Sequence, residues 1–153
     1  MYEEGGPLNY KQWMQDDLRD LERLRFSIGQ MESELKTIAA ETAAIRATSY
    51  DKLPGSKGVN VQEERLLNAM ARKEELTANL RATRRRVADL DRLLMALPRE
   101  ELRVVQVMLI SGEKGAVERL SEELGYESAQ IYRLKDRAIA NLAQLRWGVG
   151  FRT

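Results

Sequence analysis

The sequence predicts an all-α protein in which a long antiparallel helical hairpin, a coiled coil, precedes a C-terminal helix-turn-helix domain. Composition is the first reason, because 32% of the 153 residues are charged, only 6% are aromatic and only three are proline. Such a composition is typical of long helices. Periodicity is the second reason, because apolar residues recur every three or four positions through two long segments, as they do in coiled coils.

The first expected element is a helix from about Tyr10 to Ala47, after a flexible tail at residues 1–9 that contains a Gly-Gly-Pro sequence. From Leu24 onward its apolar positions are separated by four and three residues in turn, which is a heptad seam. The residues of this seam are Leu24, Ile28, Met31, Leu35, Ile38, Thr42 and Ile45. Gly29 lies within the helix and is expected to weaken it by up to ~1 kcal/mol relative to Ala.

A loop is expected at residues 49–60, which hold one proline and two glycines. A second helix should then run from about Val61 to Met95, with a heptad seam in which Lys73 takes one clearly polar position. Two helices of about 35 residues joined by a short loop should fold back on each other over residues 10–96.

Such a thin hairpin buries little apolar surface by itself. We therefore expect it to form a homo-oligomer or to pack on the C-terminal domain. The apolar surface offered for a second copy consists of Leu80, Val87, Leu90 and Leu94.

The helix-turn-helix domain is expected over residues 97–147, with a short tail at 148–153. A short helix precedes Gly125, which suits a turn because glycine tolerates a positive φ. In the following helix, one apolar stripe recurs at spacings of three and four residues. Its members are Ile131, Leu134, Ala138, Leu142 and Leu145.

Polar residues beside this stripe are the candidate DNA contacts, since Gln and Arg side chains can form bidentate hydrogen bonds with base edges in a major groove. On a recognition helix at about residues 128–145, the expected base contacts are Ser128, Ala129, Gln130 and Arg133. The expected phosphate contacts are Tyr132, Lys135 and Arg137. An ordinary solvated helix carries similar residues, but five basic residues against one acidic residue in 128–153 favour DNA.

Other functions are disfavoured by what the sequence lacks. It contains neither cysteine nor histidine, which excludes disulfides and Cys/His zinc sites. It also removes the commonest general base and the thiol nucleophile. We expect no enzyme activity, no catalytic residue, no cofactor and no metal site. No apolar run approaches ~20 residues and no signal-peptide pattern is present, so we expect a cytoplasmic protein without a membrane contact.

The segment from Leu97 to Leu145 resembles region 4 of sigma-70-type factors. A Leu-Pro pair at residues 97–98 opens a helix that precedes the turn at Gly125, as in that family. Glu127 stands where those factors usually have a Ser or Thr helix cap, and Ser128 and Ala129 replace a common Arg-Glu pair. The resemblance therefore implies a DNA-binding fold, but the base preference of those factors cannot be carried over to this chain.

A longer resemblance covers most of the chain. Two long helices joined by a Lys-Leu-Pro-Gly-Ser linker, then Leu124-Gly125-Tyr126 and residues 130–134, look like phage and prophage late-transcription regulators of the ArpU/RinA type. This resemblance implies a sequence-specific activator of phage late or packaging genes, which acts on double-stranded DNA in the cytoplasm of the bacterial host. Two other functions also fit: a small-terminase-like protein that recognises DNA for packaging, and a coiled-coil adaptor that binds host RNA polymerase.

Overall fold

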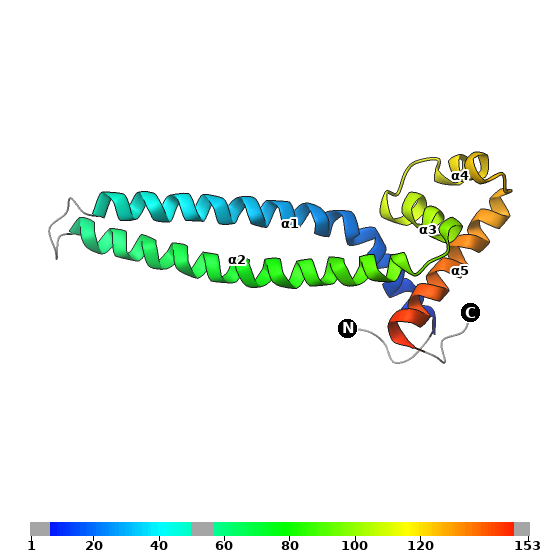
Figure 1. The fold of residues 1–153 in the computed structure, drawn as a ribbon, viewed down its shortest axis with the longest axis horizontal. Coiled ribbons are helices and arrows are strands. Elements are labelled where there is room, and N and C mark those ends of the chain that lie inside the picture. Colours follow the sequence, from blue (N-terminus) through cyan, green and yellow to red (C-terminus); the bar gives the residue numbers. More distant parts are fainter. Residues whose placement is uncertain (1–6, 50–56, 149–153) are drawn as a thin grey trace. The chain divides into compact units, whose positions relative to one another are not determined.

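The computed structural model describes residues 7–49 and 57–148, and these residues form helices and connecting turns without any β-strand. The elements are α1 (Pro7–Ser49), α2 (Lys57–Met95), α3 (Arg99–Val105), the π-helical turn η1 (Gln106–Ile110), α4 (Ala116–Leu124) and α5 (Ser128–Trp147) (Figure 1). The all-α fold class is thereby confirmed. In the ranges just given, no helix combines the length and the apolar character needed to cross a bilayer.

Both long helices begin earlier than expected. α1 begins at Pro7, and α2 begins at Lys57 and includes Gly58. Proline suits the first turn of a helix because the N–H that it lacks has no intrahelical partner there. The remaining part of the expected loop, residues 50–56, and the expected tails at residues 1–6 and 149–153 lie outside the described residues.

The chain divides into two compact units, each described here by itself. The hairpin unit comprises residues 25–86. Within the described residues, the C-terminal unit combines residues 87–148 with residues 7–24 of α1. Residues 10–24 and 87–96 were expected to belong to the hairpin. Met14, Leu18, Leu21, Leu90 and Leu94 of these segments are buried, whereas Met95 is 82% exposed.

In the hairpin unit, α1 and α2 run side by side in opposite directions (Figure 1). Its buried apolar residues are Ile38, Ala69 and Leu80. Ion pairs between exposed side chains join the helices, since Arg72 contacts both Glu34 and Glu41, the latter at 3.6 Å. Arg84 and Glu32 form a further pair at 3.3 Å. The hairpin therefore combines a narrow apolar seam with charged pairs at its flanks.

The apolar surface that was predicted from the sequence to bind a second copy is buried in this structure. Leu80, Val87, Leu90 and Leu94 are all at least nine-tenths buried within the single chain. The last three lie in the C-terminal unit, which also contains α3, η1, α4, α5 and the first part of α1. Any association of two copies therefore has to use another surface.

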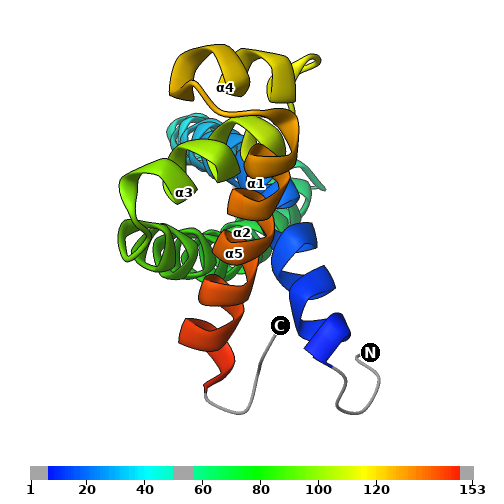
Figure 2. The ribbon, with the colours of Figure 1, turned by 90° about the vertical axis from the view of Figure 1, so that its right-hand side faces the viewer.

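In the C-terminal unit, α3, η1, α4 and α5 enclose one apolar core (Figure 2). Pro98 separates α2 from α3, because proline lacks the N–H that a continuing helix requires. The core residues come from all four elements: Val104, Val107, Leu120, Ile131 and Leu134. Partly buried side chains pack against them: Met108, Ala116, Val117, Leu124 and Tyr126. This core fixes α5 against three other elements.

Candidate nucleic-acid interface

The turn between α4 and α5 is formed by Gly125. Its φ is 74°, in the left-handed region, and its N–H donates a hydrogen bond of 2.9 Å to the Ser121 carbonyl oxygen. Glycine adopts this conformation without a Cβ clash. Leu120 of α4 and Ile131 of α5 are fully buried on either side of the turn. A short helix, a left-handed glycine and a longer helix therefore form one rigid element.

Polar contacts join α3 to α4 and to the turn. The Arg103 guanidinium donates two hydrogen bonds of 2.8 Å to the Glu123 carboxylate. This hydrogen-bonded pairing lowers the pKa of Glu123 and raises the pKa of Arg103. The Tyr126 hydroxyl donates to the Glu100 carboxylate at 2.9 Å, and this bond raises the pKa of the Tyr126 phenol. The positive charge of Arg103 is thus paired with Glu123 within the C-terminal unit.

A buried hydrogen bond joins α3 to α5. The Glu101 side chain is only 5% exposed, and its carboxylate accepts a hydrogen bond of 2.7 Å from the Asn141 amide. A buried carboxylate requires such a partner because its loss from water is costly. Asn141 thereby sets the position of α5 along α3.

The C-terminal half of α5 is occupied by contacts with the first turns of α1. Arg146 pairs with Asp17, and the Trp147 ring lies 6.1 Å from the Trp13 ring and 5.1 Å from the Tyr10 ring, centroid to centroid. Figure 2 shows α1 in blue beside the lower, red part of α5. Arg146, near the C-terminal end of the helix, is therefore paired inside the unit.

The apolar stripe of α5 changes direction along the helix. Ile131, Leu134, Ala138 and Leu142 are buried as expected, but Leu145 is 55% exposed. The expectation for Leu145 was wrong because the covered side moves towards Ile139 and Ala143, which are both buried. Ile139 and Ala143 lie on the same side of the helix as Tyr132 and Asp136. That side is therefore exposed near the start of α5 and buried near its end. The continuous accessible face of α5 is therefore limited to residues 128–137.

The seven candidate contact residues all lie on this accessible half of α5. Five of them are exposed: Ser128, Ala129, Tyr132, Arg133 and Arg137. Tyr132 is 48% exposed, and the Lys135 ammonium lies 5.5 Å from the centroid of its ring. Gln130 and Lys135 are half-buried at the edges of the face. At 100° per residue, Gln130 and Arg137 share one edge and Lys135 lies on the other.

Asp136 is a member of this face that the sequence analysis did not single out. It is exposed, and it follows Tyr132 and Arg133 at spacings of four and three residues, so it lies near the middle of the face. The same spacing rule applied to the sequence would have found it. An acidic side chain there can accept a hydrogen bond from cytosine N4 and repels phosphate.

The described arginines of the C-terminal unit are either paired with an acidic side chain or, like the exposed Arg19 and Arg99, form no ion pair with a described residue. Arg103, Arg119 and Arg146 are each paired with an acidic side chain. Within the part of the chain that the structure describes, Arg133 and Arg137 form no ion pair, although Asp136 lies within one turn of both. The accessible half of α5 therefore presents two positive charges that no acidic side chain neutralises.

Nothing in this region resembles a metal centre, since residues 7–49 and 57–148 contain no group of three or more acidic, His or Cys side chains placed to hold a metal ion. Comparison with known protein families, with curated proteins and with solved structures finds no match to this chain. The site must therefore be interpreted from its own geometry and charge.

Proposed function

We propose that this chain is a sequence-specific regulator of transcription that binds double-stranded DNA with the first half of α5 in the major groove. In this proposal α4, Gly125 and α5 act as a helix-turn-helix of the sigma-70 region 4 type, and residues 25–86 act as a coiled-coil hairpin. The likeness to ArpU/RinA-type regulators supports control of phage late genes in the cytoplasm of a bacterial host.

One observation carries the proposal: the unpaired, exposed arginines of α5 lie on a helix whose opposite side is anchored in a core. Positive side chains that no acid neutralises attract the phosphate backbone and release its counterions. Anchoring by Leu120, Ile131 and Leu134 means that the backbone of α5 needs little ordering when these side chains bind.

The dimensions of the accessible face support the same function. Residues 128–137 form a helical segment about 15 Å long, and an α-helix about 10–12 Å in diameter fits a major groove about 12 Å wide. The first turn, with Ser128 and Ala129, lies closest to the base edges in such a pose, and Gln130 and Arg133 supply the bidentate hydrogen bonds. Tyr132, Lys135 and Arg137 lie beside them and contact phosphates.

The decisive experiment compares Arg133→Ala with Arg92→Ala in selections from randomised duplexes. Arg92 is also exposed in the C-terminal unit, but it pairs with Asp89 at 2.7 Å, so the two variants lose the same charge. Arg133→Ala should lose about 1 to 3 kcal/mol of discrimination at one base pair, whereas Arg92→Ala should keep the wild-type preference. A uniform loss on all duplexes would make Arg133 a phosphate contact instead.

The phosphate contacts are tested by salt dependence. Arg137→Ala should weaken binding to specific and random duplexes alike and reduce the slope of log affinity against log salt by about 1. The slope for Arg92→Ala should stay at the wild-type value. If the intact protein binds none of the duplexes but retains purified host RNA polymerase, the function as an adaptor replaces DNA binding.

A further inference from the structure

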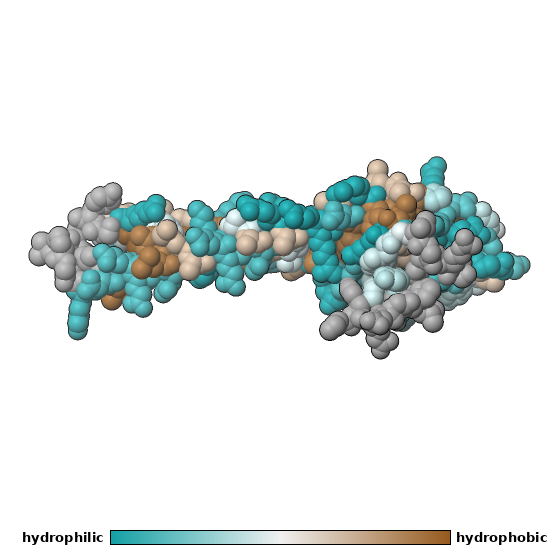
Figure 3. All heavy atoms as spheres, turned by 90° about the horizontal axis from the view of Figure 1, so that it is seen from below, coloured by the Kyte–Doolittle hydropathy of each residue, from teal (hydrophilic) through white to brown (hydrophobic). Residues whose placement is uncertain are grey.

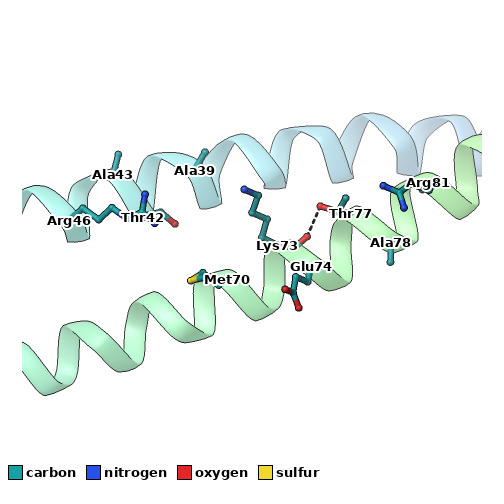
Figure 4. Close-up of a pocket in the computed structure, with 10 residues that line it drawn as sticks. All are labelled: Ala39, Thr42, Ala43, Arg46, Met70, Lys73, Glu74, Thr77, Ala78 and Arg81. Carbon is teal, nitrogen blue, oxygen red and sulfur yellow. Dashed lines mark hydrogen bonds between the residues drawn. The ribbon is translucent and has the colours of Figure 1, made fainter.

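We propose that the hairpin unit binds a second copy of this chain through one flank, where α1 and α2 leave a groove of about 610 Å³ between them (Figure 4). This flank groove lies entirely within residues 39–81. In this proposal the second copy binds at the flank groove and not at the buried seam residues that were expected from the sequence. The inference does not depend on DNA binding.

The groove exists because the seam carries small or polar residues at this level. Thr42 of α1 and Lys73 of α2 take seam positions where a coiled coil usually has large apolar side chains. Figure 4 shows the Lys73 side chain directed towards the space between the helices. The walls include Ala39, Ala43 and Ala78, whose small side chains allow another helix to approach closely.

Large apolar side chains lie exposed along the same flank. Met70, which lines the groove, is 46% exposed, and Leu67, one turn earlier on α2, is 66% exposed. Figure 3 shows hydrophobic side chains gathered on the hairpin near its loop end. Two helical surfaces can interlock when the large exposed side chains of one copy fit into the groove that small side chains line in the other.

One acidic and one basic side chain on this flank can pair with those of a second copy, beside Arg46 and Lys73, which also line the groove. Glu74 and Arg81 line the groove seven residues apart on α2 and therefore lie on one stripe of a coiled-coil helix. A two-fold axis that passes between Thr77 and Ala78 brings Glu74 of one copy opposite Arg81 of the other, and it does so twice. Small side chains then lie on the axis itself. A two-fold interface of this kind is the commonest form of self-association.

The area of the flank sets the expected strength. From Leu67 to Arg84 it is about 26 Å long, and two helices side by side are about 20 Å wide, so each copy covers on the order of 500 Å². The total of about 1,000 Å² is near the lower limit for a specific interface. We therefore expect a dimer that dissociates in the micromolar range.

A charge exchange in the full chain tests this arrangement by sedimentation equilibrium. Glu74→Arg and Arg81→Glu should each weaken the dimer about fivefold or more, because each places like charges opposite each other at two points. The double variant should recover affinity close to that of the wild type. Circular dichroism of each variant checks that helix content is unchanged. A dimer that is indifferent to all three variants uses another surface, and a chain that stays monomeric through the micromolar range has no such interface; either result overturns the proposal.

Crosslinking gives a second readout, because the chain contains no cysteine of its own. Ala78→Cys places one thiol beside the expected axis, and a short bis-maleimide should join two copies. Asn79→Cys is the matched control, since the next residue is equally exposed but is turned about 100° away, to the side of Arg72. Equal crosslinking at both positions indicates random collision and contradicts the proposal.

Discussion

The hairpin unit and the C-terminal unit are both built from helices, but they are stabilised in different ways. The hairpin buries a narrow seam and joins its helices through pairs such as Arg72 with Glu34, whose side chains are about half exposed. Exposed ion pairs contribute only about 0–1 kcal/mol each. The C-terminal unit surrounds a closed apolar core and satisfies its one buried glutamate, Glu101, with a hydrogen bond.

This difference follows from the number of helices that surround a residue. A side chain between two helices keeps one or two sides open to water, whereas α3, η1, α4 and α5 close around Leu120 from several directions. The hairpin therefore retains exposed apolar side chains such as Leu67 and Met70. The C-terminal unit retains charge instead, on the exposed half of α5. The predictions below test this contrast, from the largest expected effect to the smallest.

Truncation of a core residue should give the largest difference in stability between the two units. Leu120→Ala should cost about 3 to 5 kcal/mol, because neighbours on several sides hold the cavity open. Ile38→Ala in the hairpin should cost about 2 kcal/mol, because an open pair of helices can relax around the gap. Both residues are at most 1% exposed, so they are matched in burial.

Two probes of urea unfolding measure these losses. The only two tryptophans, Trp13 and Trp147, both lie in the C-terminal unit, so their fluorescence reports on that unit, whereas circular dichroism reports on all helices. Leu120→Ala should shift the fluorescence transition strongly and Ile38→Ala should shift it little. If the two variants shift both probes equally, the chain unfolds as one cooperative unit and the contrast fails.

Loss of the buried hydrogen bond between Asn141 and Glu101 should have the next largest effect on stability. Asn141→Ala should destabilise the C-terminal unit by about 1 to 3 kcal/mol, because the Glu101 carboxylate is left buried without its partner. Gln12→Ala removes the exposed hydrogen bond of 2.9 Å to Asp16 in the same unit and should change stability by about 0.5 kcal/mol or less. Thermal unfolding followed by tryptophan fluorescence compares them. Equal effects would mean that water reaches Glu101.

One substitution should have opposite signs in the two units. Gly125→Ala should cost about 1 to 2 kcal/mol, because an L-residue at φ 74° is strained. Gly29→Ala should stabilise by about 0.5 to 1 kcal/mol, because Gly29 is helical in α1 and an added Cβ meets nothing within 4 Å. Denaturant midpoints decide the matter. A stabilising Gly125→Ala would contradict the left-handed turn.

The smallest effect concerns pH. Arg103 lowers the folded-state pKa of Glu123 below its unfolded value, so the pair adds stability above the unfolded pKa of about 4.3 and loses it as pH falls through the lower, folded pKa. Glu123→Gln should therefore be less stable than the wild type at pH 6, and this gap should close in strong acid. A gap that persists in strong acid would reflect packing of Glu123.

Much of the fold could be predicted because helix periodicity is a local property. The spacing of Ile131, Leu134 and Ala138 indicated their burial, and the structure buries all three. The left-handed turn at Gly125 followed from the conformational freedom of glycine. The candidate DNA contacts also lie on the accessible half of α5, although their role as contacts stays a prediction.

The remaining features depend on contacts between residues far apart in sequence. Leu145 was expected to be buried, but α5 turns a different side inward near its end, where Arg146 meets Asp17. The burial of Val87 and Leu90 within one chain likewise depends on the C-terminal unit. The spacing of residues within a single helix cannot predict these contacts. We have no physical account from the sequence of why η1 widens to a π-helical turn.

The pairing of Asp17 with Arg146 also constrains the order in which the chain can fold. Hairpin contacts form between residues that leave the ribosome close together in time, whereas 129 residues separate Asp17 from Arg146. At about 5–20 residues per second, synthesis of that stretch takes about 6 to 26 s. During this interval Met14, Leu18 and Leu21 lack the helix that completes their unit, and they expose an apolar face to chaperones and to other nascent chains.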